Sequence, residues 1–135
     1  MPAVEAEVNS LPDISNEQLA AISSEMVRLK AQHYGKGPVG AKTYVNDSFI
    51  FSVLKEGMTA GERILIDGGD GGIVRQFRLC LKEHMTRAFT DSVERIVGRR
   101  VITYESQVLF DPDFCVEIFL LGEEVVANQE IAEAS

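Results

Sequence analysis

The residues best suited to chemistry in this chain form a glycine-rich segment that leads into a predicted helix. Residues 68–72 read Gly-Gly-Asp-Gly-Gly, and Arg75 and Arg78 follow in the first turns of that helix. Backbone N–H groups at a helix N-terminus, together with two guanidinium groups, can bind a phosphate or a carboxylate. The spacing matches neither the Walker motif nor the dinucleotide-binding motif, and no predicted strand comes directly before it. The simpler interpretation is a flexible break between two helices, with both arginines solvated.

The same helix carries charges of opposite sign on opposite flanks. Helical geometry places Arg75, Arg78 and Lys82 on one flank, because they are spaced three and four residues apart. Such a helix could bind a partner protein through complementary charge. An ordinary solvated helix surface shows the same pattern, since surface ion pairs contribute little to stability. The other flank carries Glu83, Arg87, Asp91 and Glu94.

Two cysteines and two histidines make up a nominal zinc-ligand set. Cys80 and His84 are four residues apart on the predicted helix, and His33 and Cys115 would complete the set. The paired short spacings of a structural zinc site are missing, so we expect no metal. We expect His84 and both cysteines to be core residues. Two reduced thiols are also typical of a cytosolic protein.

The sequence contains no recognisable arrangement for nucleophilic catalysis. It has neither a Gly-x-Ser-x-Gly motif nor a Cys-His signature. Asp47, Asp111 and Asp113 lie in predicted turns between strands, where an Asp side chain commonly bonds the local backbone. We therefore expect a protein without enzymatic activity and without a cofactor.

Composition and charge distribution limit the class of protein. The chain has 135 residues, enough for one domain, and a net charge of −8. Residues 1–14 and 122–135 hold seven of the 21 acidic residues and no Lys or Arg, so the remainder has 14 acids against 13 bases. A nearly neutral domain with acidic ends is a poor match for nucleic acid, which needs a basic surface. No apolar run approaches the roughly 20 residues that cross a bilayer, and no signal-peptide pattern is present, so we expect a cytoplasmic protein.

The elements that must position these residues follow from capping and periodicity. Ser15 with Gln18 predicts the start of a helix that ends at Gly35, and Thr59 with Glu62 predicts a second, short helix. A long helix is expected over residues 73–97, and strands over residues 41–45, 49–54, 100–109 and 114–121. The apolar face of the long helix at residues 73–97 is predicted to comprise Val74, Phe77, Leu81, Met85, Ala88 and Ile96.

This order predicts an α+β fold with the sequence α-β-β-α-β-β. We expect a four-stranded, largely antiparallel sheet with two main helices packed on one face. The domain would span residues 15–121, between flexible acidic tails at residues 1–14 and 122–135. Both faces of the strand at residues 49–54 are mostly apolar, which indicates a central strand or a dimer contact. A homodimer is therefore expected.

Several segments of the chain together resemble the MpsC-like family. The segments are Gly35-Lys36-Gly37-Pro38, Thr43-Tyr44, Asp47, Met58-Thr59, Glu62-Arg63, Arg78 and residues 90–101, which include Gly98. The resemblance covers about residues 17–121, and its most specific part is the Gly-Lys-Gly-Pro loop followed by Thr-Tyr. The chain departs from the family pattern at Ala60, where the family usually has Pro after Thr, and in its additional glycines at residues 68–72.

The family name refers to a sodium-translocating, membrane-potential-generating system, so the resemblance implies a small accessory protein beside membrane ion or inorganic-carbon uptake components. Our first hypothesis is therefore a non-enzymatic accessory or regulatory protein that binds a protein partner, such as a membrane transport complex. The alternative is a homodimer that senses an anion or nucleotide, near residues 68–78 or 35–42. The candidate binding residues for either function are Lys36, Gly37, Arg75, Arg78 and Lys82.

Overall fold

The computed structural model describes residues 14–124 as a four-stranded sheet with three helices. The order α-β-β-α-α-β-β confirms the predicted α+β class. The last strand continues past residue 121, so residues 122–124 belong to the sheet. The elements are α2 (Asn16–Tyr34), β1 (Gly40–Asn46), β2 (Phe49–Lys55), α3 (Ala60–Asp67), α4 (Gly71–Val97), β3 (Arg99–Leu109) and β4 (Phe114–Glu124).

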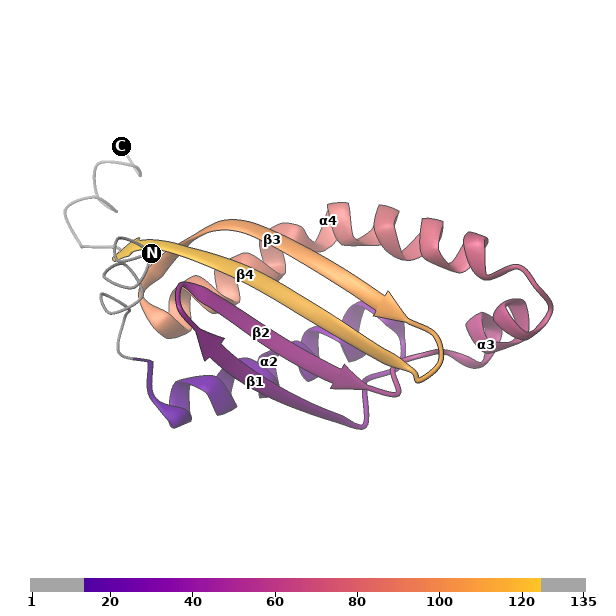
Figure 1. The fold of residues 1–135 in the computed structure, drawn as a ribbon, viewed down its shortest axis with the longest axis horizontal. Coiled ribbons are helices and arrows are strands. Elements are labelled where there is room, and N and C mark those ends of the chain that lie inside the picture. The colour runs from indigo at the N-terminus through magenta and orange to yellow at the C-terminus, as the bar shows by residue number, and fades with distance from the viewer. Residues whose placement is uncertain (1–13, 125–135) are drawn as a thin grey trace, which may run out of the picture.

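The sheet has the strand order β1-β2-β4-β3, and every neighbouring pair is antiparallel. Two hairpins, β1–β2 and β3–β4, therefore meet through their second strands. The central place of β2 agrees with its apolar character on both faces. The long helices α2 and α4 lie together behind the sheet, and the other face of the sheet is open to the viewer (Figure 1). The short helix α3 lies at one end of the molecule, next to the start of α4.

Local capping explains where the helices begin and end. The Ser15 hydroxyl accepts a hydrogen bond from the Gln18 backbone N–H, and the Gln18 side chain accepts one from the Ser15 N–H. Thr59 and Glu62 form the same reciprocal pair at α3. Gly35 ends α2 with a φ of 83°, a conformation that favours glycine because it has no Cβ. Both predicted capping boxes and this glycine cap are thus confirmed.

The hydrophobic core fills the space between α2, α4 and the inner face of the sheet. Helix α4 contributes Met85, Phe89 and Val93, and Phe89 is fully buried. The prediction that Phe77 belongs to the buried face was wrong, because its side chain is 55% exposed. The buried residues of α4 follow steps of four and seven residues from Val74, which places Arg78 rather than Phe77 over the core. The other main contributors are Ile22, Met26, Leu29, Ile50, Leu54, Phe119 and Leu121.

A carboxylate at the helix–helix contact makes stability depend on pH. Glu25 of α2 accepts hydrogen bonds from Arg28 at 2.7 Å, from Ser92 of α4 at 3.1 Å and from Arg95 of α4 at 3.3 Å. The bond from Arg28 contributes most to lowering the pKa of Glu25 from 4.5 to about 2. Because the folded state holds this proton less tightly, the stabilisation is complete above pH 4.5 and is lost as the pH falls towards 2.

We therefore expect the melting temperature to fall more steeply between about pH 5 and pH 2 in the native protein than in a Glu25→Gln variant. Thermal unfolding followed by circular dichroism across this range would measure both profiles. The Glu83→Gln variant changes an exposed acid of α4 and should keep the native profile. Parallel profiles for the native protein and Glu25→Gln would contradict the prediction.

Candidate functional site

Three predicted site residues line one groove between α4 and β3. Arg75, Arg78 and Lys82 all lie on its α4 side, as their helical spacing predicts. The groove has a volume of about 190 Å³. Every formally charged side chain that lines it is cationic, so it favours a negatively charged group. We call it the basic groove; its other residues are Tyr34, Leu79, Ser106, Gln107 and Val108.

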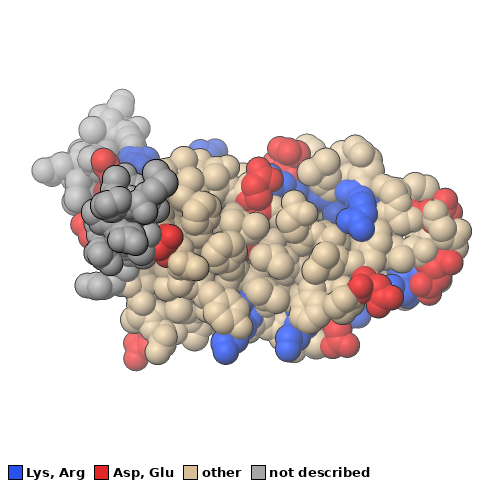
Figure 2. Space-filling view, viewed as in Figure 1, with Lys and Arg blue, Asp and Glu red and all other residues tan. Residues whose placement is uncertain are grey.

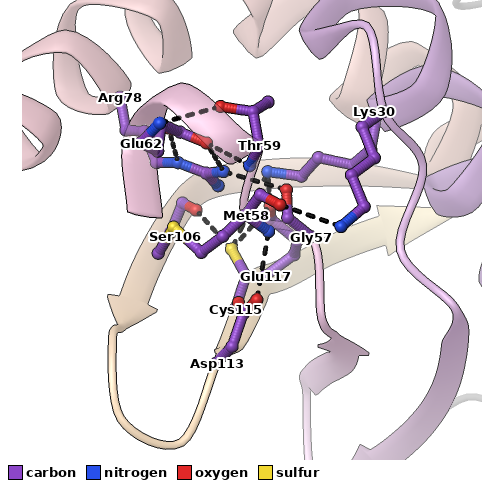
Figure 3. A network of polar contacts seen from close by, with 11 residues as sticks. Lys30, Gly57, Met58, Thr59, Glu62, Arg78, Ser106, Asp113, Cys115 and Glu117 are labelled. Atoms are coloured by element: carbon purple, nitrogen blue, oxygen red, sulfur yellow. Dashed lines mark hydrogen bonds and ion pairs between the residues drawn. The ribbon is translucent and has the colours of Figure 1, made fainter. Parts of the chain in front are cut away.

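Arg78 forms the inner end of the basic groove and is not solvated. Its side chain makes two short bonds to Glu62 of α3, from Nε at 2.6 Å and from Nη2 at 2.7 Å. Nη2 also donates to the Gly57 carbonyl at 3.2 Å. Arg78 is only 5% exposed, which corrects the interpretation of two solvated arginines. Figure 3 shows this pair beside the Thr59 cap.

Electrostatics hold both partners of this pair in their charged forms. Burial alone would raise the pKa of Glu62, but the hydrogen bonds from Arg78 and Thr59 outweigh it and lower the pKa. Burial would likewise lower the pKa of Arg78, but Glu62 raises it. Arg78 therefore joins α4 to α3 and to the loop after β2 by a charged, directional contact.

Arg75 and Lys82 make fewer hydrogen bonds and ion pairs than Arg78 does, although the Lys82 side chain is only 11% exposed. Arg75 donates through Nη1 to the Val108 carbonyl at 3.1 Å, and its guanidinium lies 4.1 Å from the centre of the Phe110 ring. Lys82 Nζ lies 3.6 Å from a Glu105 oxygen and 5.2 Å from the centre of the Tyr104 ring. An arginine has five N–H donors and a lysine three, so both keep donors that could bind a ligand.

The Gly35–Pro38 loop contributes Lys36 but not Gly37 to a neighbouring pocket. Lys36 Nζ donates to the Met58 carbonyl at 2.9 Å, and Lys36 and Arg78 line a pocket of about 10 Å³. That volume holds about one water molecule. Gly37 packs against α2, since a Cβ at this position would come within 3.0 Å of the Ala31 Cβ. The absence of a side chain at Gly37 thus permits close packing.

The glycine-rich segment does not form a phosphate cradle with the two arginines. A Cβ on Gly71 would lie 2.9 Å from the Phe110 ring, so this glycine lets α4 begin close to the β3–β4 turn. Arg75 lies over the same ring, and Arg78 is directed to Glu62. The contacts of both guanidinium groups are therefore with protein groups other than residues 68–72.

A second buried ion pair, which the sequence analysis missed, lies beside Arg78. Lys30 Nζ of α2 is 2.6 Å from Glu117 Oε1 of β4, and the two side chains are 5% and 0% exposed. The Tyr104 hydroxyl donates to the other Glu117 oxygen at 2.7 Å. Alternation along β4 offered a signal, because it places Glu117 on the same face as Cys115 and Phe119.

The ion pair controls the protonation of its neighbours. Burial alone would lower the pKa of Lys30, but Glu117 raises it above its ordinary value. Burial, reinforced by the charge of Glu117, raises the pKa of Tyr104 and brings that of Cys115 to about 11. Cys115 is therefore a protonated thiol at neutral pH and a weak nucleophile. It lies within the cluster shown in Figure 3.

The other candidate residues have structural positions. Asp47 adopts a φ of 55° in the β1–β2 turn, and Asp113 accepts a hydrogen bond from the Met58 N–H at 3.1 Å. Cys115 is buried, but Cys80 and His84 are exposed, so the prediction that these two belong to the core was wrong. Within residues 14–124, no three His, Cys, Asp or Glu side chains come together as a metal site. All buried side-chain N and O atoms in this part of the chain have hydrogen-bond partners.

The described part of the chain contains no helix long and apolar enough to cross a membrane. The comparison with protein-family models gives a match over residues 15–123, to the family described as the Na+-translocating membrane potential-generating system (MpsC). No curated protein and no solved structure matches the chain. The family match covers nearly all of the sheet and its helices, including the basic groove, and the chain therefore belongs to the MpsC family.

Proposed function

We propose that this protein is a non-enzymatic accessory subunit of a membrane ion-transport system and that its basic groove binds an acidic segment of a protein partner. The observation that carries the proposal is the set of three cationic side chains that line one groove, two of which keep unused donors. Leu79 lies at the same groove and is 54% exposed, which adds an apolar contact that a peptide could cover. The family description supplies the membrane system.

Arginine is one of the residue types that contribute most at protein interfaces. A carboxylate in the groove would receive N–H groups from Arg75 and Lys82, beside the Ser106 hydroxyl and the Gln107 amide. The binding should weaken with added salt, because charges at the rim of an interface are screened. We place the protein at the cytoplasmic side of the membrane, as a peripheral homodimer.

Sensing of a small anion or nucleotide is the less favoured alternative. The groove charge supports it, but each cation already has a protein contact: Arg78 with Glu62, Arg75 with Val108, and Lys82 near Glu105. A free anion would compete with these contacts, whereas a protein partner would add contact with Leu79. The structure therefore favours the partner over the free anion.

The double variant Arg75→Glu/Lys82→Gln should weaken partner binding by about tenfold or more, because it reverses one groove charge and removes another. Arg78 is left intact, since its buried pair with Glu62 contributes to the fold. The measurement is affinity capture from native membranes, with the retained ion-transport protein quantified at two salt concentrations.

The matched control is Arg87→Glu, which makes the same charge reversal at an exposed position of α4 outside the groove. It should capture as much partner as the native protein does. Equal capture by the groove variant, at an unchanged melting temperature, would rule out the groove as the binding surface.

A further inference from the structure

The face of the sheet opposite the helices is apolar at its centre and open. On this face, the strand register aligns residues in rows of four, with one residue from each strand. One row reads Tyr44, Phe51, Ile118, Glu105, and the next reads Lys42, Val53, Val116, Gln107. Figure 2 shows this face, with few charged side chains over the middle of the sheet.

In these two rows, polar side chains occur only on the two edge strands, and the side chains on β1 differ from those on β3. Edge strand β1 carries two donors, the Tyr44 hydroxyl and the Lys42 ammonium group. Edge strand β3 carries the Glu105 carboxylate, which also lies 3.6 Å from Lys82 Nζ of the same copy, and the Gln107 amide, which accepts through oxygen and donates through nitrogen. Glu105 is 62% exposed at its side chain, and Tyr44 is 46% exposed. The positive charge of Lys42 at one edge and the negative charge of Glu105 at the other make the face complementary to a copy of itself.

We infer that two copies of the chain pack through this open face, with β1 of one copy over β3 of the other. A two-fold axis parallel to the strands, above the line between β2 and β4, produces that arrangement. It brings Tyr44 over Glu105 of the second copy and Lys42 over Gln107, with Glu105 one row away. An axis across the strands would instead place β1 over β1, which keeps Lys42 away from Glu105 of the second copy.

The apolar side chains of β2 and β4 also face apolar side chains under this two-fold axis. The axis places Phe51 of one copy over Ile118 of the other, and Val53 over Val116. Phe51 also stacks on Phe49 at 5.9 Å, so the aromatic pair is already ordered before association. Four apolar side chains from each copy would thus be covered, which is the apolar centre and polar rim of a protein interface.

The face is large enough for a specific dimer. Four strands about 4.8 Å apart and seven residues long at about 3.3 Å each give an area of about 19 by 23 Å per copy. Packing two such faces buries roughly 900 Å² in total, which is the size of a weak specific interface. The association should therefore be measurable at micromolar concentrations and sensitive to single substitutions.

The inference rests on the proposed homodimer. It shares Gln107, and Glu105 as the neighbour of Lys82, with the basic groove. The two proposals are separated by their measurements, which are oligomeric state for the dimer and partner capture for the groove. Sedimentation velocity of the full chain should show a dimer, and Ile118→Lys should convert it to a monomer. The new lysine lies directly across from Glu105 in the sheet, so the variant can form a cross-strand ion pair and remain folded. The control is Ile64→Lys, the same substitution on α3 at a side chain that is 72% exposed.

Charge exchange tests the orientation. Lys42→Glu alone, and Glu105→Lys alone, should each weaken the dimer about tenfold, because each brings like charges within one row of each other at two symmetric contacts. Glu105→Lys also places a second cation beside Lys82 of the same copy, so Lys42→Glu is the cleaner single exchange. The double exchange Lys42→Glu/Glu105→Lys should restore the native affinity to within about threefold. A monomer at all concentrations, dissociation by Ile64→Lys instead of Ile118→Lys, or single exchanges without effect would overturn the inference.

Discussion

A Lys30→Met variant is expected to lose about 3–5 kcal/mol of the free energy of unfolding, because it removes the counter-ion of a buried carboxylate. Glu117 is fully buried and lies 2.6 Å from Lys30. After the substitution only the Tyr104 hydroxyl and the Cys115 thiol would still donate to it. Urea unfolding at neutral pH, followed by circular dichroism, would measure the loss as a lower transition midpoint.

The double variant Lys30→Met/Glu117→Gln distinguishes the loss of the counter-ion of Glu117 from a general loss of core packing. A glutamine oxygen can still accept the Tyr104 hydrogen bond, and no uncompensated charge is left. The double variant should therefore be more stable than Lys30→Met alone, with a coupling of about 2 kcal/mol between the two sites. A loss below about 1 kcal/mol for Lys30→Met would contradict the assignment of a buried ion pair.

Arg78→Met is expected to destabilise the protein by about 3 kcal/mol, because Glu62 would keep its charge at a largely buried site without the guanidinium. Arg78→Lys should lose about 1–2 kcal/mol, since an ammonium group cannot make the two parallel bonds that Nε and Nη2 make. Hydrogen exchange should show the largest loss of protection in α3, which Arg78 joins to α4.

Arg75→Met is the control for this series, because Arg75 is exposed on the same helix and donates one hydrogen bond to β3. Its effect on stability should stay within about 0.5 kcal/mol, as for most surface substitutions. Equal losses at Arg75 and Arg78 would show that the Glu62 pair has no special role. The urea midpoint is again the measurement.

The different structural roles of Arg75 and Arg78 also affect how the proposed function should be tested. Arg78 holds the inner end of the basic groove in place, and its substitution would alter the groove through the fold. Arg75 and Lys82 line the groove and keep N–H donors that no described protein group uses. Partner binding is therefore best tested at Arg75 and Lys82, and fold stability at Arg78 and Lys30.

The sequence by itself determined the elements whose signals are local. The reciprocal bonds at Ser15 and Thr59 join residues three apart, and the left-handed turn at Gly35 depends on one residue alone. The strand at β2 is mostly apolar on both faces, which indicated a central strand or a dimer contact, and β2 is central in the sheet. Helical spacing likewise placed Arg75 and Lys82 on one flank of α4. Such interactions do not depend on where the rest of the chain lies.

Only the tertiary structure decided which charged residues became partners. Lys30 reaches Glu117 of β4 because α2 packs on the inner face of the sheet, and Arg78 meets Glu62 because α3 lies beside α4. Phe77 is exposed and Arg78 buried for a related reason: an ion pair offsets the cost of burying the guanidinium where α3 supplies a carboxylate. These pairings join residues distant in the chain, and their energy depends on burial, which no local pattern in the sequence specifies.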